Sequence, residues 1–75
     1  MSNETTIPMN ADAMNAVINA LGALVFATVR QLPEDKRAAF AQDLAKLAKN
    51  EEKRGDVTTE TLLLDLHRAA IAAAS

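Results

Sequence analysis

The chain has 75 residues and a formal net charge of −2, with one histidine and no cysteine. This length allows one small domain, and the nearly balanced charge argues against a general nucleic-acid binder. The lack of cysteine excludes disulfides, thiolate catalysis and cysteine-type zinc sites, and one histidine is too few for a histidine-based metal site. We therefore expect no metal, cofactor or small-molecule substrate.

The first nine residues are polar and predict a flexible N-terminal tail, followed by a single helical domain over residues 10–75. Glu4 is the only charged residue before Asp12, so the basic start of a signal peptide is missing. This composition predicts a cytoplasmic protein.

The first predicted helix spans residues 10–31. Asn10 is a suitable cap, and Pro33 ends the helix because a proline disfavours helical angles in the residue before it. Large apolar side chains form one broad face: Met14, Val17, Ile18, Leu21, Leu24, Val25 and Leu32. Alanines at helical spacing form a second face: Ala13, Ala16, Ala20, Ala23 and Ala27. The two faces cover more than half of the circumference, so we expect this helix to be central and packed on two sides.

The second predicted helix spans residues 33–54, with Pro33 in its first turn and Gly55 as its terminator. Phe40, Leu44 and Leu47 form its core stripe. Its lysines are interpreted as a solvated face rather than as phosphate contacts, since Glu51 and Glu52 lie beside them.

The third predicted helix spans residues 58–74, capped by the hydroxyl of Thr58 or Thr59. One face carries most of its leucines and alanines: Leu62, Leu63, Leu66, Ala69, Ala70 and Ala73. Leu64, His67 and Ile71 form a second strip, which is either a further contact surface or a set of singly exposed apolar residues.

The expected fold is an all-α, antiparallel three-helix domain that forms a homodimer. Sixteen of the apolar residues are alanines, which bury little area, and without disulfides or metals oligomerisation is the remaining way to stabilise so small a core. The alanine row either packs on a helix of the same chain or crosses the first helix of a second copy, where small residues permit close approach.

The sequence contains no pattern of catalytic residues, so we expect no enzyme and no catalytic site. The favoured function is a non-enzymatic protein–protein interaction module, an adaptor or regulator that binds itself and another protein. The alternatives are a small DNA-binding transcriptional or plasmid/phage-type regulator and a membrane-associated helical protein, although we expect neither nucleic acid nor membrane as the partner. Candidate interface residues are the alanines and the leftover apolar positions: Ala16, Ala20, Ala23, Ala27, Phe26, Val29, Leu64 and Ile71.

Overall fold

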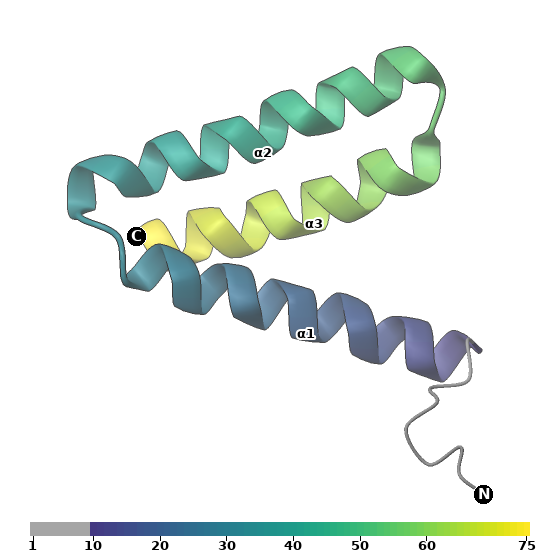
Figure 1. Ribbon diagram of the computed structural model, residues 1–75, viewed down its shortest axis with the longest axis horizontal. Coiled ribbons are helices and arrows are strands. Elements are labelled where there is room, and N and C mark those ends of the chain that lie inside the picture. The colour runs from purple at the N-terminus through teal and green to yellow at the C-terminus, as the bar shows by residue number, and fades with distance from the viewer. Residues whose placement is uncertain (1–9) are drawn as a thin grey trace, which may run out of the picture.

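The computed structural model describes residues 10–75, and this part of the chain is all-helical (Figure 1). Helix α1 spans Ala11–Arg30, α2 spans Glu34–Arg54 and α3 spans Val57–Ala74. The three predicted helices are confirmed, with bounds within one residue of those expected. The predicted tail, residues 1–9, lies outside the described residues.

The ends of α1 show local capping. The side-chain oxygen Oδ1 of Asn10 accepts a hydrogen bond from the amide of Ala13 at 2.8 Å, which confirms Asn10 as the N-cap. At the other end, the guanidinium of Arg37 reaches back from the first turns of α2. Its Nε donates to the carbonyl of Leu32 at 3.1 Å, and its Nη2 donates to the carbonyl of Arg30 at 3.3 Å. A positive charge thus satisfies the carbonyl of the last residue of α1 and one carbonyl of the connection that follows it.

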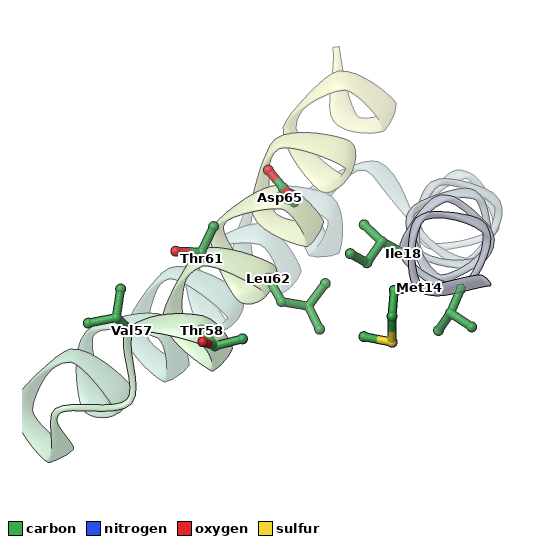
Figure 2. A pocket seen from close by; sticks show the side chains of 8 residues that line it. Met14, Ile18, Val57, Thr58, Thr61, Leu62 and Asp65 are labelled. Carbon is green, nitrogen blue, oxygen red and sulfur yellow. The ribbon is translucent and has the colours of Figure 1, made fainter. Parts of the chain in front are cut away.

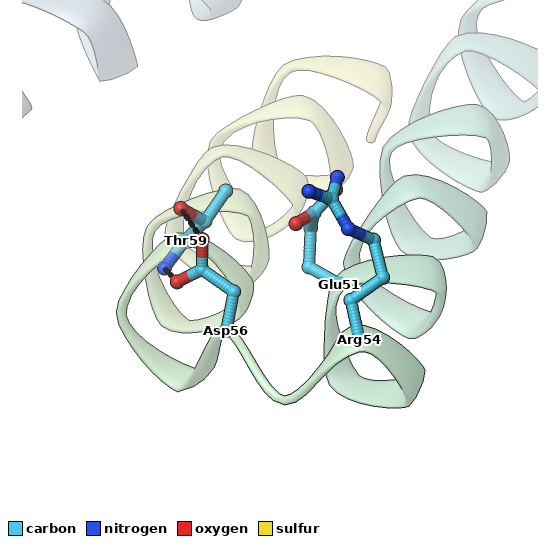
Figure 3. Close-up of polar contacts among 4 residues, drawn as sticks. All are labelled: Glu51, Arg54, Asp56 and Thr59. Atoms are coloured by element: carbon cyan, nitrogen blue, oxygen red, sulfur yellow. Dashed lines mark hydrogen bonds and ion pairs between the residues drawn. The ribbon is translucent and has the colours of Figure 1, made fainter.

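The turn between α2 and α3 is built on Gly55, which has φ of 84°. Only glycine adopts this left-handed conformation at little cost, so the predicted terminator is confirmed. The expected cap at Thr58 or Thr59 is wrong, because Asp56 occupies the cap position. Its carboxylate accepts from the amide of Thr59 at 3.0 Å and from the Thr59 hydroxyl at 2.8 Å (Figure 3).

The cap at Asp56 makes stability depend on pH. The hydrogen bond from the Thr59 amide, with smaller contributions from the Thr59 hydroxyl and Arg54, lowers the pKa of Asp56 below 3.8. A carboxylate whose pKa is lowered by folding stabilises the fold fully above its unfolded pKa. That stabilisation is lost as the pH falls through the folded pKa.

We therefore expect Asp56→Asn to flatten the acid limb of the stability curve. Asparagine caps nearly as well but does not titrate. Thermal unfolding followed by circular dichroism from pH 6 to pH 2 tests this expectation. The difference in Tm between Asp56→Asn and wild type should change as the pH falls below about 4. A constant difference over the whole range would exclude a titrating cap.

The central helix is α3, not the first helix as expected. Helix α3 turns back alongside α2 over its length and also contacts α1, whereas α1 and α2 meet only near their short connection (Figure 1). The physical reason is that α3 is apolar on two sides. Leu62 and Leu66 from its main face are half-buried, and so is Leu64 from the strip that the sequence left without a partner.

His67 connects this second strip to α2. Its ring nitrogen Nδ1 lies 2.8 Å from the carbonyl oxygen of Ala41, so Nδ1 carries the proton and donates. The imidazole is half-buried and belongs to the packing between α2 and α3 of the same chain.

The buried core lies where the end of α1, the first half of α2 and the end of α3 converge. It consists of Val29, Ala41, Ala70 and Ala73, with partly buried residues packed around it: Val25, Phe40, Leu44 and Ala74. Val29 is the largest fully buried side chain among the described residues. Leu47, expected in the core stripe of α2, is 50% exposed, whereas its neighbour Ala48 is buried at 1%, because the buried side of α2 follows Ala41 and Ala48 and is rotated from the expected stripe. Few large side chains therefore stabilise the isolated chain.

Candidate functional site

The most distinctive surface of the molecule is the side of α1 that faces away from α3. Val29 and Val25 point toward the core, and Ala20 lies nine residues before Val29, which is two and a half turns and therefore the opposite side of the helix. Four alanines of the predicted row are exposed there: Ala16, Ala20, Ala23 and Ala27. Of the two possibilities for this row, packing within the same chain is thus wrong.

Two larger apolar side chains border the alanines along one edge. Leu24 is 62% exposed and Val17 is 36% exposed, and at 100° per residue both fall on the same side of the row. We call these six residues the outward face of α1: Ala16, Val17, Ala20, Ala23, Leu24 and Ala27. Val17 and Leu24 belong to the broad face of large apolar residues, which was expected to be packed. The buried stripe is centred on the Val25 and Val29 side of that face, so the largest side chains of α1 do not all face α3.

Charge is confined to the two ends of α1. Asp12 lies in the first turn and Arg30 in the last, with no ionisable residue between them. Their separation of 18 residues is five helical turns, so both lie along the same side of α1, on the edge opposite Val17 and Leu24. Both residues are exposed, and within residues 10–75 neither forms an ion pair. The outward face is therefore apolar along its length and carries opposite charges at its two ends.

The remaining candidate interface residues have different surroundings. Val29 was expected to be an exposed contact and is instead fully buried, because the end of α1 packs on the small residues Ala70 and Ala73 of α3. Phe26 is 41% exposed and Ile71 is 50% exposed, while Leu64 is half-buried. Phe26 lies outside the outward face, on the edge that carries Asp12 and Arg30.

A second surface feature is the groove between the first halves of α1 and α3, which diverge there (Figures 1 and 2). Its volume is about 340 Å³, and its lining is mostly apolar: Met14, Val17, Ile18, Val57, Thr58, Thr61, Leu62 and Asp65. Val17 therefore lies at the border between this groove and the outward face of α1. Asp65, the charged residue of this lining, forms an ion pair with Arg68. The groove thus offers apolar contact and a few hydroxyl groups, without a free charge to orient a polar substrate.

Titratable groups do not converge elsewhere on the described chain. Within residues 10–75 no group of three or more histidine, aspartate or glutamate side chains could hold a metal ion. Glu51 pairs with Arg54 at 3.2 Å on the surface at the end of α2 (Figure 3). Such exposed pairs adjust helix ends and do not assemble acid–base chemistry.

Sequence reasoning missed two structural roles. The sequence assigned no role to Arg37, because no local pattern shows that its side chain reaches the end of the preceding helix. His67 was considered for an intermolecular edge, whereas it bonds across the hairpin to Ala41. Its place between Leu64 and Ile71 was the available signal, since a polar group on an apolar strip needs a partner when the strip is covered.

Comparisons with known proteins identify no relative. No family model, curated protein or solved structure matches this chain.

Proposed function

We propose that this chain is a cytoplasmic, non-enzymatic interaction module: an antiparallel three-helix domain that forms a homodimer through α1 and presents helical surface to another protein. The observation that carries the proposal is the exposure of an apolar helix. Helix α1 is long and apolar enough to cross a membrane, yet only 6% of its apolar 18-residue segment is buried inside the chain.

The energetics of the small core support self-association. Fully burying one aliphatic side chain contributes about 1.5–3 kcal/mol, and Val29 alone reaches that state among the larger side chains described. Association would cover Val17 and Leu24 together with the exposed alanines between them. An apolar surface of this kind on a soluble domain marks an interaction site.

The mass of the purified chain in solution tests the proposal. Size-exclusion chromatography with light scattering should give about 16 kDa, since one chain weighs 8.0 kDa. The measurement is made over a concentration series from 1 to 200 µM, because mass action favours the dimer as concentration rises. A mass of 8 kDa at every concentration would overturn self-association.

Membrane association is the second candidate, and the same exposed apolar helix favours it. A buried core helix of a soluble protein can be as long and as apolar as α1, but α1 differs from such a helix because it is exposed. Against it, the charge-free segment of α1 lacks tryptophan and tyrosine at its ends, where membrane helices concentrate them. Flotation with phosphatidylcholine vesicles separates the candidates. A membrane-associated chain should float with the vesicles, whereas a dimer that buries this face should stay at the bottom of the gradient.

DNA binding receives less support from the surface. The arginine of α3, Arg68, is already paired with Asp65, and Glu60 lies in the first turn of the same helix. A helix that reads the major groove needs free donors and tolerates few carboxylates beside phosphate. A mobility shift with duplex DNA at 50 and 200 mM salt would reveal such binding by its loss at the higher salt.

A further inference from the structure

The proposed self-association does not specify whether two copies of α1 run in the same or in opposite directions. The charges of α1 favour one of these two arrangements. Asp12 and Arg30 are exposed on the same side of the helix at opposite ends. Two copies of α1 pointing in the same direction would place like charges at the same end of the dimer, on opposite edges of the contact, and would form no Asp12–Arg30 pair. Two copies pointing in opposite directions would place each Asp12 beside Arg30 of the second copy and would also oppose the helix dipoles favourably.

The apolar residues favour the same register. A twofold axis between Leu21 and Gly22 places Ala16 opposite Ala27 of the second copy, and Ala20 opposite Ala23. The midpoint between Asp12 and Arg30 is residue 21, so charges and alanines agree on the position of the axis to within half a residue.

The two edges of the outward face are compatible with this orientation. In a twofold pair of helices running in opposite directions, each edge meets the same edge of the other copy. Val17 therefore lies beside Leu24 of the second copy on the apolar edge, while Asp12 lies beside Arg30 on the charged edge. In the same-direction arrangement, the apolar edge of one copy would instead face the charged edge of the other.

From this complementarity we propose that the outward face of α1 docks on the same face of a second copy, with the two helices running in opposite directions and two Asp12–Arg30 pairs at its ends. This inference rests on the proposed homodimer and adds its orientation and register. Because the side chains between the two helices are small, the helix axes can approach closely, and the exposed alanines can then contact the second copy.

Cysteine cross-linking tests the orientation directly, because the chain contains no cysteine of its own. Ala16→Cys and Ala27→Cys are prepared separately and oxidised alone and as an equimolar mixture. In the proposed dimer, positions 16 and 27 face each other across the axis, within reach of a disulfide. The two copies of position 16 lie about 16 Å apart along the direction of the helices, which is too far for a disulfide. The mixture should therefore form a disulfide between the two variants, and each variant alone should not.

The outcomes separate the two proposals. Ala39→Cys, an exposed alanine of α2, gives the background from random collisions. A dimeric mass with efficient cross-linking of Ala16→Cys to itself would overturn the orientation and leave the homodimer standing. A dimeric mass with only background cross-linking would overturn the docking face, and a monomeric mass would overturn the homodimer as well.

Charge exchange supplies a second measurement. Asp12→Arg and Arg30→Asp should each raise the dissociation constant about two- to thirtyfold, because each changes two attractive pairs into repulsive ones. The double variant restores opposite charges in the proposed dimer and should return to the wild-type affinity. Additive weakening in the double variant would contradict the Asp12–Arg30 pairing.

Discussion

Replacing Ala20 with Leu is expected to raise the dissociation constant of the proposed dimer at least about thirtyfold while leaving the single chain folded. Ala20 is exposed in the chain and lies near the middle of the outward face, so a leucine there can extend into solvent in the single chain. In the dimer the same leucine enters a close helix crossing. Overpacking such a site costs about 1–3 kcal/mol, and a twofold interface contains it twice, which gives about 2–6 kcal/mol.

Sedimentation equilibrium measures this change, and circular dichroism confirms that the helices remain. The matched control is Ala39→Leu, the same substitution at an exposed alanine of α2, which should leave the dissociation constant unchanged. Because a leucine can also add apolar contact area, Ala20→Lys provides a second variant, in which two like charges meet across the twofold axis. A dimer that tolerates both Ala20 variants would show that the outward face is not the interface.

The helix boundaries were predictable because local chemistry determines them. Asn10 caps α1 through its own side chain, and Gly55 ends α2 through a backbone conformation that other residues adopt only with strain. The cap of α3 was misassigned because Asp56 and the threonines after it are all good caps. Which of these residues becomes the N-cap depends on where the turn at Gly55 ends. The N-cap preferences of residue types do not determine that position.

The order of helices in space was not predictable from one helix at a time. The 3.6-residue pattern of α1 correctly showed an alanine row and large apolar residues, but it could not determine which side meets a neighbour. That choice depends on Ala70 and Ala73, whose small side chains allow the end of α1 to pack on α3. Val29 then becomes the buried residue, and Leu24 becomes exposed. The alanine row could be identified as a candidate surface from spacing, whereas its exposure could be learned only from the packing.

The same small-residue packing predicts a large effect inside the hairpin. Ala41→Leu is expected to lower the free energy of unfolding by about 1–3 kcal/mol or more. Ala41 is fully buried in α2, and its carbonyl accepts the hydrogen bond of His67 from α3. A leucine at this position needs space that α3 already fills, so the two helices must separate and the bond to His67 must lengthen.

This loss is large for a chain of 75 residues, whose total stability is expected to be about 4–11 kcal/mol. Each kcal/mol should lower Tm by about 4–8 °C, which calorimetry resolves easily. Ala39→Leu is again the matched control, since it adds the same atoms two residues away on the exposed side of α2 and should change stability by less than about 0.5 kcal/mol. Equal Tm values for the Ala41 and Ala39 variants would mean that α2 and α3 are not in close contact at Ala41. The pairing of α3 with α2, and with it the exposure of α1 that the proposed dimer requires, would then be wrong.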